Sequence, residues 1–147
     1  MSWIKPTRED LTATISSEEI DAFSASADFS DVVDANLRRT VQLVRGYVRA
    51  GGMTLPEDES LMPPSLLAPA MDYAAYDLLK RFSVEISEPR RRAREDALSI
   101  FKEVGSGRMK VEPHEVTATS GAALPSFAAI RPERRLDTLG QPPTSYE

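Results

Sequence analysis

The sequence lacks cysteine altogether and has a single histidine, His114. The absence of cysteine excludes disulfides and thiolate metal sites, and it is compatible with a reducing cytosol. Because zinc sites draw mainly on cysteine and histidine, we expect no metal site and no cofactor. His114 follows Pro113 outside any predicted helix, where no rigid scaffold would hold the partner that acid–base catalysis requires.

Long apolar runs and catalytic motifs are also missing. No run approaches the roughly 18 residues of a membrane-spanning helix, so we expect no membrane association. Residues 1–6 have no cationic segment followed by an apolar one, which predicts no secretory signal. The sequence has no Gly-rich phosphate loop, no nucleophile elbow and no paired-carboxylate site, and it therefore predicts a protein that is not an enzyme.

One oxygen-rich segment, residues 28–34, invites a calcium hypothesis. It lacks the glycine at the sixth position and the glutamate at the twelfth that an EF-hand loop uses. Capping of the following helix by Asp28 or Ser30 explains the same residues, and we prefer that interpretation.

The charge that is present is mostly acidic and unevenly spread. The chain has 147 residues, enough for one domain, and a net charge of −5. The whole acidic excess lies in residues 1–106, whereas residues 107–147 are neutral. An acidic body argues against a general nucleic-acid binder, although DNA could pass such a surface without adhering to it.

Residues 1–106 predict a body of about five helices, two of them short. Thr7 with Asp10, and Ser16 with Glu19, are capping signals that predict a short helix after each pair. Between about residues 30 and 49, apolar residues recur at the three- and four-residue spacing of one helical face. Gly51-Gly52 should end this helix, with one of the two glycines in the left-handed conformation.

Two further helices complete the predicted body. One covers about residues 65–82, where Pro69 is tolerable only in the first turn, and the other runs from Ser87 to about Val104. After Gly107, residues 109–112 and 115–119 alternate weakly and could form short strands. The sequence thus predicts a mainly α fold: a helical body over residues 1–106 and an extended C-terminal arm over residues 107–147.

The last predicted helix begins with four arginines: Arg90, Arg91, Arg92 and Arg94. Cations at a helix N-terminus oppose the macrodipole, so helix stability does not explain them, and only Arg90 and Arg94 share a face. A local interpretation pairs Arg91 with Glu95 and Arg92 with Asp96. The functional interpretation places the four arginines against a neighbouring subunit or against DNA.

The arm carries apolar residues set among a second group of arginines. Because aromatic residues and arginine are enriched at interface hot spots, this mixture is typical of a docking segment. The candidate partner-binding residues are Leu124, Phe127, Ile130, Arg131, Arg134, Arg135 and Leu136.

The order of the turn and packing motifs resembles that of a known family. Residues 6–11 open the chain, a capped segment follows at 17–20, and a long helix ends in Gly46-Tyr47-Val48. A Leu55-Pro56 loop and residues 71–78 come next. Over residues 3–107 this order is similar to that of the head–tail connector (adaptor) proteins of tailed bacteriophages, in particular the Mu-like branch.

The resemblance implies a structural role in the neck of a virion assembled in the host cytoplasm. Such adaptors form a ring, typically of twelve neighbouring copies, below the portal protein, and the ring continues the DNA channel towards a stopper or tail-completion protein. DNA would pass through without specific binding, and the arm would grip the portal. The alternative is a cytosolic helical regulatory protein whose arm binds a single partner.

Overall fold

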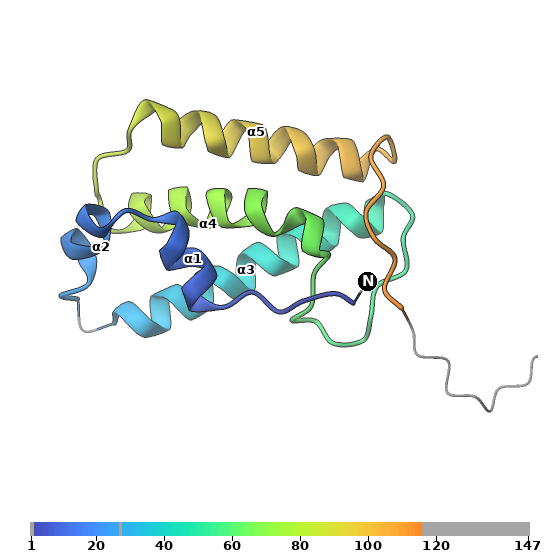
Figure 1. Ribbon diagram of the computed structural model, residues 1–147, viewed down its shortest axis with the longest axis horizontal. Helices are drawn as coiled ribbons and strands as arrows, with labels where there is room; N and C mark the ends of the chain where they lie inside the picture. The colour runs from blue at the N-terminus through green and yellow to red at the C-terminus, as the bar shows by residue number, and fades with distance from the viewer. Residues whose placement is uncertain (1, 27, 116–147) are drawn as a thin grey trace, which may run out of the picture. The chain divides into compact units, whose positions relative to one another are not determined.

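The part of the chain that the computed structural model describes, residues 2–26 and 28–115, is a bundle of helices (Figure 1). Within those residues no β-strand forms, and one isolated antiparallel bridge joins Ile4 to Met62. The mainly α fold predicted from the sequence is confirmed. The helices are α1 (Arg8–Thr14), α2 (Ser17–Phe23), α3 (Phe29–Ala50), a 3₁₀ turn (Pro64–Leu66), α4 (Leu67–Arg81) and α5 (Glu88–Gly105).

The two short helices begin at the predicted capping boxes. The Thr7 side chain accepts a hydrogen bond from the Asp10 backbone N–H, and the Asp10 carboxylate accepts one from the Thr7 N–H. Ser16 and Glu19 make the same reciprocal pair at the start of α2. Each pair satisfies donors that would otherwise lack a partner, which lets helices of only two turns begin at fixed residues.

The long helix α3 starts differently from the prediction. Asp28 is its N-cap residue but makes no side-chain capping hydrogen bond, so the proposed capping by Asp28 or Ser30 is wrong. The Ser30 hydroxyl instead accepts a hydrogen bond from Arg8 on α1. At the other end the prediction is confirmed, because Gly52 has φ +91°, in the left-handed region.

Proline marks the first turns of the last two helices, as predicted. Pro69 is the third residue of α4, and Pro89 is the second residue of α5, after the N-cap Ser87. In both places the missing N–H has no intrahelical partner to lose.

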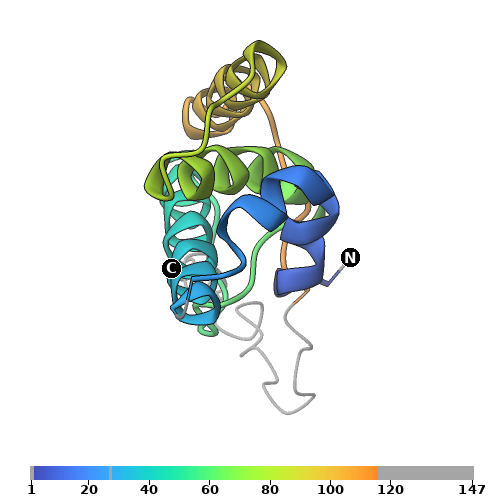
Figure 2. The same cartoon turned by 90° about the vertical axis from the view of Figure 1, so that its left-hand side faces the viewer.

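Helix α4 is the centre of the bundle, since it packs against α1, α3 and α5 (Figure 2). Its Ala70, Ala74 and Ala75 are fully buried, and these small side chains let the neighbouring helices approach closely. The Asn36 amide on α3 donates a 2.8 Å hydrogen bond to the Ala74 carbonyl, so a buried polar side chain links the two helices.

The C-terminal ends of α3 and α5 are in close contact. Tyr47 stacks on Phe101 with ring centroids 5.8 Å apart. A Cβ placed on Gly51 would lie 2.3 Å from the Val104 carbonyl oxygen, and one on Gly105 would lie 3.0 Å from the Tyr47 ring. Both glycines therefore provide the space that brings the two helices together.

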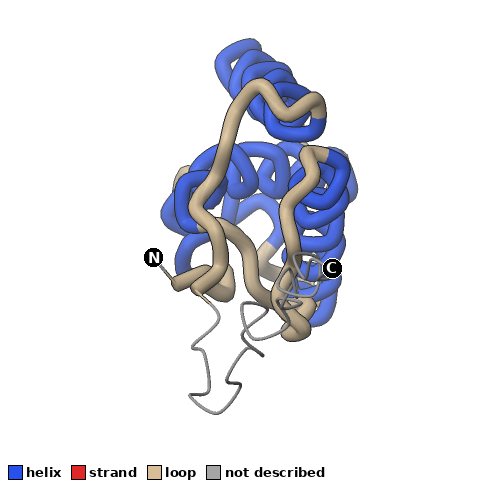
Figure 3. Tube along the Cα trace, turned by 90° about the vertical axis from the view of Figure 1, so that its right-hand side faces the viewer, coloured by secondary structure: helices blue, strands red, loops and turns tan. Residues whose placement is uncertain are grey.

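Residues 108–115, which we call the return segment, run from the end of α5 back to the N-terminal segment (Figure 3). Val111 is buried in the core, and the Trp3 indole N–H donates a 2.8 Å hydrogen bond to the Glu112 carbonyl. The Ser65 hydroxyl donates to the Glu112 carboxylate at 2.7 Å. This segment is tied to the body by side chains.

One expectation about this region changes accordingly. Residues 109–112 are not a strand: among the described residues no second strand pairs with them, and Glu112 bonds to the side chains of Trp3 and Ser65. The chain divides by its contacts into a unit of Met1–Val116 and a unit of Thr117–Glu147, and the expected domain boundary at residue 106 stays a prediction. The contacts of residues 107–116 group them with the helical unit. The further expected strand residues, 116–119, lie outside the described part of the chain.

Candidate assembly surfaces

Arg90, the first of the four clustered arginines, points into the body. Its Nη2 donates a 2.7 Å hydrogen bond to Glu19, and its Nη1 donates a 3.2 Å hydrogen bond to the Thr14 carbonyl. The side chains of Arg90 and Glu19 are only 13% and 18% exposed. Burial alone would raise the pKa of Glu19, but hydrogen bonds from Ser16 and Arg90 outweigh it and lower that pKa.

Arg94, which shares the face of Arg90, lies between two aromatic rings of α4. Its guanidinium carbon is 4.6 Å from the ring centroid of Tyr76 and 5.3 Å from that of Tyr73. Such cation–π contacts contribute roughly 0.5–2 kcal/mol each. The sequence indicated that Arg90 and Arg94 lie on one face, and the structure gives both of them partners within the chain.

Arg91 and Arg92 are exposed, and the local pairs predicted for them are wrong. Both reach back to Glu88, at 3.8 and 3.5 Å, rather than forward to Glu95 and Asp96. Glu88 stands in the first turn of α5, where the macrodipole favours a carboxylate, so it also offsets the arginine charge. Contact of the four arginines with a neighbouring subunit or with DNA stays a prediction, and Arg91 and Arg92 are the two with exposed side chains.

The predicted partner-binding residues of the arm, from Leu124 to Leu136, lie outside the described residues. Their role stays a prediction.

The outer face of α3 is a second basic surface. We use this name for five exposed residues that lie within about 100° of one another around the helix: Arg38, Arg39, Gln42, Gly46 and Arg49. Among the described residues, the three arginines make no ion pair. The sequence places these arginines towards the end of α3 but gives no sign that they share a free surface.

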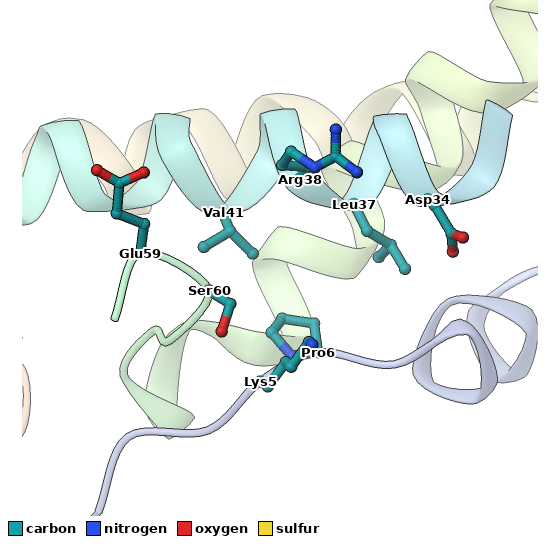
Figure 4. Close-up of a pocket in the computed structure, with 8 residues that line it drawn as sticks. All are labelled: Lys5, Pro6, Asp34, Leu37, Arg38, Val41, Glu59 and Ser60. Carbon is teal, nitrogen blue, oxygen red and sulfur yellow. The ribbon is translucent and has the colours of Figure 1, made fainter. Parts of the chain in front are cut away.

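A groove of about 330 Å³ runs along one side of this face (Figure 4). Pro6, Leu37 and Val41 form its apolar floor, and Arg38 and Glu59 stand at its rim. At one end, Arg8 holds Asp34 through hydrogen bonds of 2.8 and 2.6 Å. Those hydrogen bonds lower the pKa of Asp34 and outweigh its partial desolvation, which would raise that pKa. The positive charge of Arg38 also lowers it.

A smaller hollow, of about 170 Å³, continues along α3 past Gly46 to Arg49 and is closed on its far side by Leu55 and Glu59. Two more grooves, of about 340 and 410 Å³, lie on the other side of α3 against α4, and both include Arg39 and Asp77. All four are open and lined by charged side chains. The outer face of α3 is therefore bordered by grooves on both sides.

Arg45 holds the loop that forms one wall of the first groove and of the smaller hollow. Its guanidinium is buried, and it donates to three backbone carbonyls, those of Pro56 (2.7 Å), Leu61 (2.9 Å) and Asp58 (3.0 Å). Burial lowers the pKa of Arg45, although the nearby Glu59 carboxylate opposes the effect. The sequence does not reveal this role, because the acceptors in the loop are backbone carbonyls, which the residue types do not identify.

Within the described residues, every helix is too short or too polar to cross a lipid bilayer. These features together define a mainly α-helical protein whose grooves are open, charged and gathered along one helix. Over residues 6–128 the chain matches the family described as Bacteriophage Mu, Gp36. The match covers most of the chain, which therefore belongs to this family and is a Mu-like phage protein. The comparisons with curated proteins and with solved structures gave no match.

Proposed function

We propose that this protein is a structural head–tail connector, an adaptor that forms a ring below the portal protein. The ring continues the DNA channel and links the head to the stopper or tail. The observation that carries the proposal is the match to the phage Mu family over residues 6–128, which takes in the helical body and the beginning of the arm. In this proposal the protein acts by assembly in the virion neck and not by catalysis.

The proposal assigns the two units different tasks. The helical unit would build the ring, and its acidic excess would let DNA slide through without adhering. The arm would dock on the portal through its apolar residues and arginines. The hydrogen bonds that tie Glu112 to Trp3 and Ser65 support this division, because they fix the point from which the arm leaves the body. A single arm would contribute little, but many arms engaged at once gain avidity.

The test is light scattering of the purified protein, alone and mixed with the portal protein encoded by the same phage. We expect a complex with the portal whose mass corresponds to many copies of this chain. A variant that lacks residues 117–147 should keep its helical circular dichroism and lose portal binding. Phe127→Ala and Arg131→Ala in the full chain should weaken binding in the same assay.

A result of the opposite kind would favour the alternative of a regulatory protein. A strict monomer that ignores the portal protein would exclude the adaptor role. A monomer in the absence of portal protein would be compatible with it, because the portal can supply the template for the ring.

A further inference from the structure

Gly46 lies within α3, about one turn before its C-terminal end, and no contact among the described residues explains why a glycine stands there. A glycine in a helix interior is less stable there than alanine would be, because it loses more backbone entropy on folding. Gly51 and Gly105 are explained by close neighbours, but a Cβ placed on Gly46 would meet nothing within 4 Å. Gly46 also has an ordinary helical backbone, since the only glycines with positive φ among the described residues are Gly52 and Gly107.

The surroundings of Gly46 indicate contact with another molecule. It is exposed on the outer face of α3, between Gln42 and Arg49 along the helix, and it lines the hollow that Leu55 and Glu59 line on the other side. A missing side chain at such a position lets a partner's backbone or side chain approach the helix closely. The neighbouring arginines, which have no ion pair, indicate that the partner carries negative charge.

The chain itself exposes acidic side chains of the required kind. Helices α1 and α2 expose Glu9, Glu18 and Asp21, and none of the three forms an ion pair in the described residues. Figure 2 shows α3 along one side of the body and α1 with α2 along the other. A surface of one charge on one side and of the opposite charge on the other suits head-to-tail association, which closes into a ring when the rotation between copies allows it.

We propose that the outer face of α3 binds the acidic α1–α2 surface of a second copy of this chain. The arginines pair with Glu9, Glu18 and Asp21 of that copy, and Gly46 provides the close approach. The acidic excess of the chain favours this occupant over DNA, which such an excess repels. The inference rests on the proposed function, because it names the contact from which the ring is built.

Two variants, each of which blocks one half of the contact, test the inference. Gly46→Leu fills the hollow on α3, and Glu18→Arg with Asp21→Arg reverses the charge of the α1–α2 surface. Each variant should be at least tenfold weaker in self-association than the unchanged chain, as measured by light scattering against concentration or with the portal protein present. A 1:1 mixture of the two variants retains one intact contact, and it should give dimers that do not grow further.

Folding is controlled separately. Gly46→Leu should unfold at the same temperature as the unchanged chain or higher, because leucine is the better helix former on an exposed face. Ser99→Leu, at an exposed position of α5, is the matched control and should assemble normally.

The outcomes separate this inference from the proposed function. If the unchanged chain neither binds the portal nor self-associates, both the proposed function and the proposed contact between copies are wrong. If the unchanged chain assembles and Gly46→Leu assembles equally well, or the mixed variants form no dimer, the α3 contact is overturned and the connector role stands. Binding of a labelled DNA duplex that is lost in Arg39→Glu would also overturn it, since the α3 face would then bind nucleic acid.

Discussion

Arg90 and Glu19, separated by most of the helical unit in sequence, share a 2.7 Å ion pair at the start of α5. The same Glu19 oxygen accepts hydrogen bonds from the Ser16 N–H and hydroxyl. One carboxylate therefore caps α2 and anchors α5. Arg90 opposes the dipole of its own helix, α5, and its presence there is explained by its contacts with Glu19 on α2 and with the Thr14 carbonyl.

Replacing Arg90 with alanine should destabilise the protein by about 1–3 kcal/mol, because Glu19 and the Thr14 carbonyl lose a charged donor in a partly buried place. Urea unfolding followed by circular dichroism measures the change. Arg92→Ala is the matched control from the same cluster, and it should change stability by less than about 0.5 kcal/mol because its ion pair is exposed. Equal losses in the two variants would contradict the anchoring role.

The pH dependence of stability should reflect two carboxyl groups near Arg90, those of Glu19 and Asp72. The pKa of Glu19 is lower in the fold than its ordinary value of 4.5. Its contribution is therefore present above about pH 4.5 and is lost as the pH falls through the folded pKa. Glu19→Gln should make the free energy of unfolding less dependent on pH between about 5 and 3.

Asp72 should act with the opposite sign. Burial raises its pKa, and the Asp96 charge adds to this, although Arg90 opposes both. Because the folded state holds that proton more tightly than the unfolded chain, Asp72 lowers stability as the pH rises through its raised pKa. Asp72→Asn should steepen the gain in stability between pH 3 and 5, and an unchanged slope would contradict the assignment.

Replacement by alanine should change the stability in opposite directions at Gly46, within α3, and at Gly51, its C-cap residue. Gly46→Ala should stabilise the protein by about 0.5–1 kcal/mol, since the methyl group meets nothing. Gly51→Ala should destabilise it by about 1–3 kcal/mol, because the Cβ would lie 2.3 Å from the Val104 oxygen and the ends of α3 and α5 would have to separate. The φ of Gly51 is −74°, so only space is at issue. Thermal unfolding of both variants measures the contrast, and a change of the same sign in both would contradict it.

Arg45→Met should loosen the loop over residues 56–61 while keeping much of the buried volume. Three backbone carbonyls would lose their common donor, which should cost about 1–3 kcal/mol. Hydrogen exchange should accelerate in the loop, at Ser60 and Leu61, before it does in α4. Uniform acceleration across the body would instead indicate general destabilisation.

The sequence was sufficient to predict the helices because their signals are local. Thr7 with Asp10 and Ser16 with Glu19 fix helix starts through groups three residues apart, and Pro69 and Gly52 limit helix ends through their own backbone preferences. The capping predicted for Asp28 was wrong because a residue of a type that commonly caps helices need not make the side-chain hydrogen bond. Here no such bond forms.

The assembly surfaces could not be predicted in the same way. Arg91 and Arg92 each have a carboxylate within reach on both sides in the sequence, Glu88 before them and Glu95 or Asp96 after them. The spacing alone does not determine which ion pair forms. The role of Arg45 depends on carbonyls brought to it by the fold. The free face around Gly46 becomes visible only when its neighbours are known, because the same residue type at Gly51 is needed for packing.

The return segment should be necessary for the stability of the body. Deleting residues 117–147 should leave the unfolding temperature unchanged, whereas deleting residues 108–147 should lower it, because Val111 leaves the core and Trp3 loses its hydrogen bond to Glu112. Burial of one valine contributes roughly 1.5–3 kcal/mol and a neutral hydrogen bond about 1 kcal/mol. Trp3 is the only tryptophan and is 4% exposed, so its fluorescence should shift to longer wavelength in the longer deletion alone. Val111→Ala in the full chain should reproduce part of the loss of stability. Equal unfolding temperatures and equal emission in the two deletions would place the end of the body before residue 108.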